Sequence, residues 1–278
     1  MAVQRITARN AQFQVWESLL ANRTKRQREG EFLVQGVRPI TLAVEHRWPI
    51  RALLYDAGRR MSKWADELLR TVDARLIAMA PELLAELGEK DDAEPPELIA
   101  VVGLARDDLD RIKLGPEFLG VAFDRPTAPG NLGSVIRSAD AFGAHGLIVT
   151  GHAADPYDPK AVRASTGSLF ALPTVRVPGP AQVEAWRAEQ RARGVEIRLV
   201  GTDEHGEADV DACDLTGPTL LAIGNETTGL SQGWREACDA LVRIPIGGAA
   251  SSLNAANAAT VVLYEAARQR RAAARRPR

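Results

Sequence analysis

The chain has 278 residues, of which 45% are hydrophobic and 26% charged, the balance of a globular protein with material for two domains. Its formal net charge of −1 excludes a chain that is basic throughout, so any nucleic-acid surface must be local. The only cysteines, Cys213 and Cys238, lack metal-site spacing and suit a reducing cytosol. The N-terminus has no signal-peptide core, and no apolar run approaches membrane-spanning length. We therefore expect a soluble, cytoplasmic protein without a membrane segment or a bound metal.

Residues 5 to 30 are strongly basic, with six arginines and lysines against two glutamates. Apolar residues such as Phe13 and Trp16 recur there at helical spacing, which predicts a helix with one buried face. Two interpretations of the basic residues stay open. They form an ordinary solvated helix face, or an arm in which Arg9, Lys25 and Arg26 contact RNA phosphates.

Short apolar runs alternate with helical segments over the next hundred residues, a pattern that indicates a small α/β domain. We expect this domain to span residues 1–106, with an acidic exposed loop at 88–97. A charged, turn-rich stretch at 107–116 is predicted to be the linker to a second domain. The predicted strands are 32–34, 50–55, 75–78 and 98–102, and the predicted helices are 37–45, 63–69 and 81–87.

The second domain, residues 117–278, repeats the alternation and predicts a parallel sheet with helices around it. A basic tail at 268–278 is expected to fray at its end. The predicted strands are 118–123, 146–149, 197–202, 219–224 and 241–246, an extended segment covers 169–177, and helices cover 134–142, 159–164, 182–193, 232–238 and the residues from 254.

Glycine-bearing loops follow several of these strands. In parallel sheets, ligands bind at the carboxyl ends of strands, where loops lead into helices. The last such loop, residues 244–254, combines two glycines with helix-capping residues, and by itself it is either a ligand cradle or a plain strand-to-helix connection. No Gly-x-Gly-x-x-Gly follows the first strand of the domain and no phosphate-binding Gly-Lys-Ser/Thr loop is present. Both absences disfavour a dinucleotide site and an ordinary Rossmann methyltransferase.

Three segments of the second domain resemble the three motifs of the SpoU (TrmH) family in order and spacing. They are Asn131-Leu-Gly-Ser-Val-Ile-Arg137, Ile223-Gly-Asn-Glu226-Thr-Thr-Gly, and Ile244-Pro-Ile-Gly-Gly-Ala-Ala-Ser-Ser252-Leu-Asn254. The family consists of S-adenosylmethionine-dependent RNA ribose 2′-O-methyltransferases of the SPOUT class. The first domain resembles the ribosomal-protein-like substrate-binding domain often fused to these enzymes, notably at residues 30–36. Within the family, the whole chain is most similar to the ribosomal RNA methyltransferases that confer avilamycin resistance.

The resemblance implies a deep trefoil knot in the second domain and a homodimer with the active sites at its interface. It implies S-adenosylmethionine as cofactor and RNA as partner, most specifically 23S ribosomal RNA, with a role in antibiotic resistance. The implied reaction is attack of a ribose 2′-hydroxyl on the methyl carbon of a sulfonium. The positioning of the reactants and the handling of the hydroxyl proton would be the protein's main tasks.

The resemblance also assigns catalytic residues. Arg137 is the residue proposed to activate the hydroxyl, although an arginine stays protonated and could instead hold the neighbouring phosphate and a developing alkoxide. Asn131 is expected to cap the following helix and to place Arg137 and the RNA. Glu226 would orient Asn131 or Arg137, or simply bind backbone N–H groups in its loop. Ser252 lies near substrate or cofactor, and Asn254 supports the site.

The implied cofactor residues act mainly through backbone groups; they are Gly201, Thr202, Gly224, Asn225, Ile244 and Leu253. Arg163 is a candidate contact to RNA phosphate, with plain solvent exposure as the alternative.

Two rival functions remain at this stage. A non-catalytic RNA-binding protein on the same scaffold is disfavoured because Asn131, Arg137, Glu226 and Asn254 are all present. A nucleotide-binding α/β enzyme of unrelated chemistry is disfavoured because the phosphate-binding loops are missing.

Overall fold

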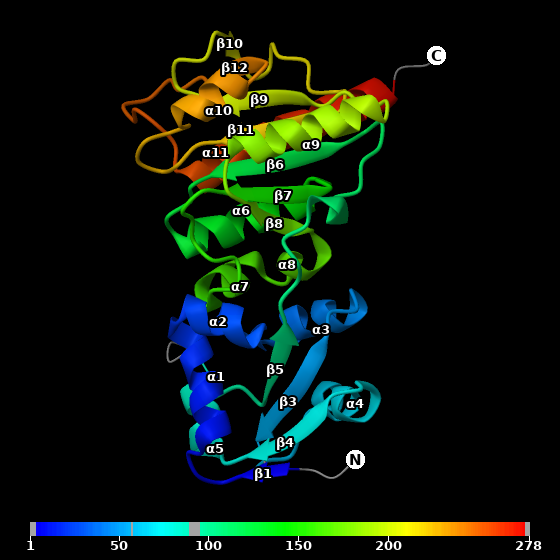
Figure 1. The fold of residues 1–278 in the computed structure, drawn as a ribbon, viewed down its shortest axis with the longest axis vertical. Coiled ribbons are helices and arrows are strands. Elements are labelled where there is room, and N and C mark those ends of the chain that lie inside the picture. Colours follow the sequence, from blue (N-terminus) through cyan, green and yellow to red (C-terminus); the bar gives the residue numbers. More distant parts are fainter. Residues whose placement is uncertain (1–3, 57, 89–94, 276–278) are drawn as a thin grey trace. The chain divides into compact units, whose positions relative to one another are not determined.

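The computed structural model describes residues 4–56, 58–88 and 95–275 (Figure 1). By its contacts, the chain forms two compact units. The first comprises residues 1–105 together with 157–171, and the second comprises 106–156 together with 172–278. The sequence-based division at 107–116 did not anticipate the return of the chain to the first unit. Most of the predicted acidic loop, and the last three residues of the predicted basic tail, lie outside the described residues.

The first unit is built on a five-stranded mixed sheet in the order β1-β4-β3-β5-β2. β5 runs antiparallel to β2 and β3, whereas β1, β3 and β4 run parallel to one another. Strand β1 was missed in the sequence. The strands are β1 (Gln4–Ile6), β2 (Glu31–Gln35), β3 (Ile50–Asp56), β4 (Arg75–Met79) and β5 (Leu98–Gly103).

Helices cover this sheet as the hydrophobic pattern requires. Phe13, Trp16 and Leu19 on the first helix are buried in a core shared with β3, β4 and β5. Asn10 caps that helix by accepting from the Phe13 backbone N–H at 2.9 Å. The helices are α1 (Ala11–Ala21), α2 (Arg23–Glu29), α3 (Val37–Glu45), α4 (Lys63–Thr71) and α5 (Pro81–Leu87).

Two further helices of the first unit, α7 (Pro159–Ser165) and α8 (Ser168–Ala171), come from the middle of the chain. They pack against β2 and α3 through an aromatic cluster. The rings of Phe32 and Tyr157 lie 4.8 Å apart, and those of Trp48 and Phe170 lie 5.1 Å apart, centroid to centroid. The Trp48 indole N–H also donates to the Phe170 carbonyl at 3.0 Å. The predicted extended segment at 169–177 is therefore helical in its first part and is a strand only from Thr174.

The second unit has a seven-stranded sheet in the order β10-β12-β9-β11-β6-β7-β8, and every recorded pairing is parallel. The central strands are buried along their whole length, as expected for a parallel sheet covered on both faces. The strands are β6 (Leu119–Asp124), β7 (Gly146–Thr150), β8 (Thr174–Val177), β9 (Arg198–Thr202), β10 (Ala208–Asp209), β11 (Thr219–Ile223) and β12 (Ala240–Arg243).

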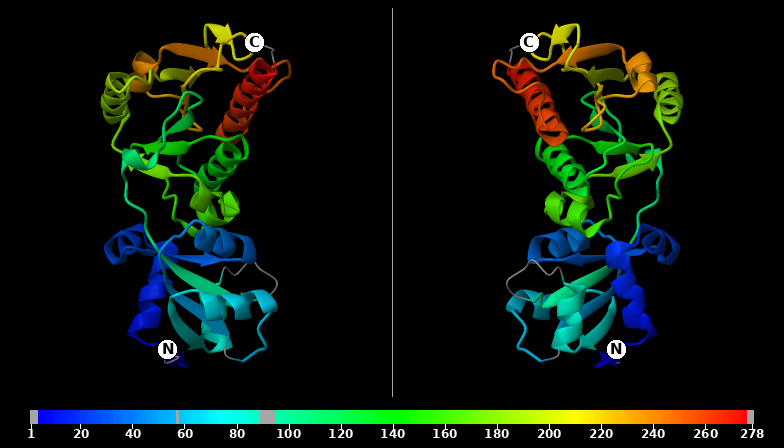
Figure 2. Two further views of the ribbon diagram at one scale, coloured as in Figure 1. Left: turned by 90° about the vertical axis from the view of Figure 1, so that its right-hand side faces the viewer. Right: turned by 90° about the vertical axis from the view of Figure 1, so that its left-hand side faces the viewer.

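Helices α9 (Pro180–Ala192) and α10 (Gln232–Ala237) cover one face of this sheet (Figure 2). The other face carries α6 (Pro129–Ala141) and α11 (Ala255–Ala274), which pack against each other. Their contact includes a hydroxyl pair, Ser138 Oγ and Thr260 Oγ1, at 2.7 Å. A single 3₁₀ turn, Leu109–Arg111, lies in the predicted linker. The described helices include none long and apolar enough to cross a membrane.

Candidate cofactor and catalytic site

A cavity of about 650 Å³ opens in the second unit at the carboxyl ends of β9, β11 and β12. This is the edge of a parallel sheet at which ligands generally bind. Its walls come from three segments at the ends of these strands, within residues 202–209, 223–229 and 242–258, and from Arg235 on α10. Four carboxylates and two guanidiniums line it, so the lining is acidic on balance; they belong to Asp203, Glu204, Asp209, Glu226, Arg235 and Arg243.

Most residues expected to hold the cofactor line this cavity; they are Thr202, Gly224, Asn225, Ile244 and Leu253. Gly201 does not. It is buried within β9, where an added Cβ would lie 2.6 Å from the Cys238 sulfur, so its small size is explained by packing. Packing also explains why residue 224 is a glycine. An added Cβ would come within 2.4 Å of the Gly229 backbone, too close to fit.

The three motif segments meet through one hydrogen-bond network. Asn131 on α6 donates to Glu226 Oε1 at 3.0 Å, and the Asn254 amide donates to Asn131 Oδ1 at 3.3 Å. The other Glu226 oxygen accepts from the Thr127 N–H at 3.2 Å and from its hydroxyl at 3.1 Å. Motif segments that lie 95 and 123 positions apart in the sequence are therefore joined by hydrogen bonds between side chains.

The hydrogen bonds set the ionisation of Glu226. Burial by itself raises the pKa of this carboxyl, but the bonds from Asn131, from backbone N–H groups and from the Thr127 hydroxyl outweigh it. The net pKa is lower than the ordinary 4.5, so Glu226 is a carboxylate at neutral pH and accepts hydrogen bonds only.

Asn254 and Asn131 differ in their positions relative to the starts of helices α11 and α6. Asn254 caps α11, accepting from the Ala256 N–H at 2.9 Å, as the capping pattern indicated. Asn131 was expected to cap its helix, and that prediction was wrong. Helix α6 begins at Pro129, five residues before the predicted start, because proline suits the first helical turn. Asn131 therefore lies inside the first turn, with its side chain directed to Glu226.

The remaining catalytic candidates are exposed. Ser252 lines the cavity in the loop before α11. Arg137 lies on α6, about a turn and a half beyond Asn131. Within the described part of the chain, its guanidinium has no hydrogen-bond or ion-pair partner.

Comparisons with known proteins agree with this geometry. Residues 10–100 match the SpoU L30e-like domain, and residues 119–264 match the SpoU rRNA Methylase family. A Streptomyces viridochromogenes protein named 23S rRNA (uridine(2479)-2′-O)-methyltransferase is 68% identical over 269 residues, which cover 97% of this chain and 93% of that protein. The chain belongs to the SpoU rRNA methylase family.

Solved SpoU structures share the whole fold. The crystal structure of the SpoU methyltransferase AviRb from Streptomyces viridochromogenes, in complex with the cofactor AdoMet, has a TM-score of 0.91 and 68% identity, covering 94% of this chain and 98% of that one. The AdoMet-bound rRNA methyltransferase from Sinorhizobium meliloti has a TM-score of 0.82 and 30% identity, covering 96% and 98%. The likeness therefore includes both the L30e-like and the methylase parts of this SpoU family member.

The predicted RNA contacts of the first unit divide into two groups. Arg26 is 2% exposed and donates to the Leu19 carbonyl at 2.6 Å, so its assignment as a phosphate contact was wrong. It joins α1 to α2 and lies 3.7 Å from the Asp158 carboxylate. Arg9 is exposed but forms ion pairs with two glutamates. Lys25 and Arg163 lie at the surface on α2 and α7, with Lys25 partly buried.

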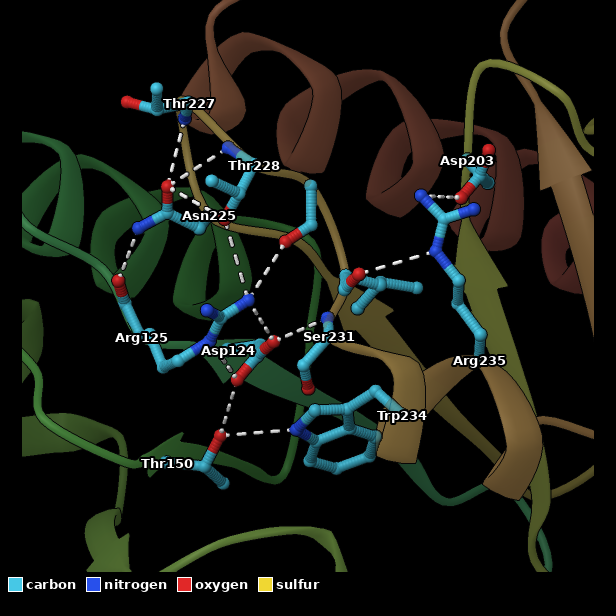
Figure 3. Close-up of polar contacts among 12 residues, drawn as sticks. Asp124, Arg125, Thr150, Asp203, Asn225, Thr227, Thr228, Ser231, Trp234 and Arg235 are labelled. Atoms are coloured by element: carbon cyan, nitrogen blue, oxygen red, sulfur yellow. Dashed lines mark hydrogen bonds and ion pairs between the residues drawn. The ribbon is translucent and has the colours of Figure 1, made fainter.

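Sequence reasoning missed several polar residues beside the site (Figure 3). Asp124 ends β6 and pairs with Arg125, whereas Asp203 follows β9 and pairs with Arg235. The Thr127 hydroxyl donates a hydrogen bond to Glu226. For the first pair the sequence offered one signal, an aspartate at the end of an otherwise apolar strand. For the second pair it offered none, because Asp203 and its partner are 32 positions apart and no motif connects them. Among the described residues, no cluster of three or more metal-ligating side chains occurs.

Proposed function

We propose that this chain transfers a methyl group from S-adenosylmethionine to a ribose 2′-hydroxyl of 23S ribosomal RNA. The observation that carries the proposal is the Asn131–Glu226–Asn254 network, which joins all three SpoU motifs beside a cavity of about 650 Å³. The 68% identity to a 23S rRNA 2′-O-methyltransferase supports the substrate class.

The cavity residues suit S-adenosylmethionine. Its sulfonium and ammonium groups are cationic, and the lining has four carboxylates against two guanidiniums. Backbone groups around Gly224, Ile244 and Leu253 would hold the adenosine part, since all three residues line the cavity. When bound, the cofactor supplies an activated methyl group on sulfur.

Arg137 acts on the RNA in this proposal. Its guanidinium stays protonated, so it serves better as a donor to the phosphate and to a developing alkoxide than as a base. Glu226 is ionised and holds Asn131 in one orientation at the start of the same helix. The proton of the hydroxyl then leaves to water or to a neighbouring phosphate oxygen.

RNA affinity is assigned to the first unit. Lys25 on α2 and Arg163 on α7 are at its surface, and Arg9 is exposed there and forms ion pairs with two glutamates. Contacts of this kind make binding salt-dependent. We also propose a cytoplasmic location, because ribosomal RNA is the proposed substrate.

The homodimer and the trefoil knot are part of the same proposal. Two large apolar residues of α11 are exposed, Val261 at 39% and Tyr264 at 50%, and Leu253 before it is exposed at 39%. An apolar helix face of this kind suits burial against a second copy. The trefoil knot is proposed from the membership of the chain in the SpoU rRNA methylase family.

The decisive experiment maps 2′-O-methyl groups on 23S rRNA after incubation with the protein and S-adenosylmethionine. One new methylated ribose is expected, and none with heat-inactivated protein. We expect Arg137→Ala to lower turnover at least about 100-fold, because a donor to developing charge is lost, while cofactor affinity stays within twofold. Arg191→Ala, which removes an exposed arginine of the same unit, is the control and should keep full activity.

The rival proposal, a non-catalytic RNA-binding protein, predicts RNA binding without any new methyl group. The intact polar network disfavours it. The predicted role in antibiotic resistance is checked separately, by comparing the drug sensitivity of cells that express the wild-type chain with that of cells expressing Arg137→Ala.

A further inference from the structure

The loop that carries Glu226 is held from both sides. We call residues 224–231, which follow β11, the Glu226 loop. In the sheet, β11 lies between β9 and β6. An aspartate with a nearly buried side chain stands at the carboxyl end of each neighbouring strand: Asp124, 4% exposed, is the last residue of β6, and Asp203, 3% exposed, directly follows β9. Each aspartate pairs with an arginine that also binds the loop (Figure 3).

On the β6 side, Arg125 donates to both oxygens of Asp124, at 3.1 and 3.0 Å. The same guanidinium donates to the Gly229 carbonyl at 3.3 Å. Asp124 Oδ2 itself accepts from the Ser231 backbone N–H at 2.8 Å. Thr150 donates to the other oxygen of Asp124 at 3.3 Å. The aspartate and the arginine therefore bind two different points of the Glu226 loop.

On the β9 side, the Arg235 guanidinium lies 2.9 Å from Asp203 Oδ2 and donates to the Leu230 carbonyl at 3.2 Å. Gly229 and Leu230 are consecutive, so the two arginines bind adjacent carbonyls from opposite sides. The two pairs differ in one respect: Asp203 and Arg235 line the cavity, and Asp124 and Arg125 do not.

The backbone of Arg125 is strained in a way that serves this arrangement. Its φ is +50°, in the left-handed region that residues other than glycine rarely adopt. Its N–H donates to the Thr150 carbonyl at 3.0 Å, and its carbonyl accepts from the Asn225 amide at 2.6 Å. Gly151 leaves room for the side chain, because an added Cβ there would lie 2.7 Å from Arg125 Cγ. Such strain persists where the surroundings fix the residue.

We propose that the Asp124–Arg125 and Asp203–Arg235 pairs are positioning residues, which fix the Glu226 loop so that Glu226 meets Asn131. The proposal rests on the proposed methyltransferase function and deepens it. Arg125 lies outside the cavity lining, so its loss lowers the rate of methyl transfer with little change in cofactor affinity. Arg235 is part of the lining, so its loss lowers both.

The test uses the purified full-length chain, 23S rRNA and radiolabelled S-adenosylmethionine, with kcat, both KM values and cofactor Kd measured for each variant. Arg125→Ala should lower kcat at least fivefold, with cofactor Kd and RNA KM within threefold of wild type. Arg235→Ala should lower kcat at least fivefold and weaken cofactor binding at least threefold. Arg176→Ala is the matched control, because it also breaks an aspartate–arginine pair (Asp107, 2.6 Å), but one on β8, three strands along the sheet from β11. Its kcat should stay within twofold.

Several results would overturn the positioning role. One is a kcat for Arg125→Ala that falls less than fivefold, and another is a rise in RNA KM alone, which would make Arg125 an RNA contact. An equal loss of kcat in Arg176→Ala would reduce the effect to general destabilisation. If Arg125→Ala does not fold, Arg125→Lys decides, since an ammonium lacks the planar fork that binds both Asp124 oxygens while also reaching the Gly229 carbonyl; it too should lose at least fivefold. Absence of methyl transfer by the wild-type chain would instead overturn the proposed function, and this role with it.

Discussion

At the scale of single residues, hydrogen bonds from neighbouring residues favour the charged form of Glu226. Donors from Asn131 and Thr127 bind its two oxygens, and they hold its pKa below the ordinary 4.5 in spite of burial. A carboxyl whose pKa is lowered by folding stabilises the protein above the pKa of the unfolded chain. That contribution is lost as the pH falls through the folded-state pKa.

We therefore expect Glu226→Gln to cost about 1 kcal/mol of unfolding free energy at pH 7, a modest value because the carboxylate is partly solvated. The amide also turns a donor toward the Thr127 N–H. The difference from wild type should shrink as the pH drops below 4.5, where the wild-type carboxyl becomes protonated. Urea unfolding at several pH values measures it. Glu196→Gln, at an exposed ion pair, is the control; a pH-independent difference for Glu226→Gln would contradict the assignment.

Residue identity alone could not separate structural from exposed cations. Arg26 and Lys25 are adjacent in one basic run, yet Arg26 is buried against the Leu19 carbonyl and Lys25 lies at the surface. Side chains at adjacent helical positions point about 100° apart, so a run of charge does not say which member faces inward. Motif residues such as Asn131 and Glu226 were identifiable because three separate segments agreed. Thr127, which donates to Glu226, lies in the loop before α6 and had no pattern of its own.

At the scale of elements, helix α11 is fastened at its end as well as at its start. The basic tail was expected to fray at its end, and its last three residues lie outside the described residues; before them, the helix continues to Ala274. Arg270 binds backbone carbonyls around the start of β6 and before β11, including Phe118 at 3.0 Å and Gly217 at 2.7 Å. Burial lowers the pKa of Arg270 without neutralising it.

Arg270→Ala should therefore lower the free energy of unfolding by about 2 kcal/mol, because a charged donor to several carbonyls is lost at once. Chemical denaturation monitored by circular dichroism checks this. Arg271→Ala, which removes the neighbouring exposed arginine over the Tyr264 ring, should cost less than about 0.5 kcal/mol. Equal losses in the two variants would show that Arg270 is not an anchor.

Helices and strands were predicted accurately where the apolar pattern was regular and the segment was long enough to show it. The ranges of α3 and α5 were predicted to the residue, since each has a regular apolar spacing and α5 also has a proline at its start. β1 was missed because three residues at a sheet edge, two of them exposed, show no alternation. Most of helix α8 was assigned as extended because a four-residue segment with three buried residues looks alike in a strand and in a helix.

At the scale of the whole molecule, sequence similarity and packing divide the chain differently. The methylase match runs from 119 to 264 and includes residues 157–171, whereas the contacts place those residues in the first unit. The chain therefore enters the first unit twice. Arg163 on α7 consequently belongs to the same unit as Lys25, which supports a single RNA surface on that unit. No local pattern revealed this, because the aromatic partners Phe32 and Tyr157 are 125 positions apart.

Residues 157–171, with which the chain returns to the first unit, should stabilise that unit measurably. Residues 1–105 alone lack the cover over Phe32 and Trp48, whereas the same fragment joined to 157–171 by a flexible Gly/Ser linker regains Tyr157 and Phe170. Burial of two large aromatic side chains predicts a gain of about 3 kcal/mol after linker entropy. Urea unfolding of the two fragments measures the gain. Phe170→Ala in the longer fragment is the matched control and should remove most of it, since this ring is 4% exposed and packs on both Phe32 and Trp48. Equal urea midpoints for the two fragments would mean that α7 and α8 do not stabilise the first unit and that its core is complete without them.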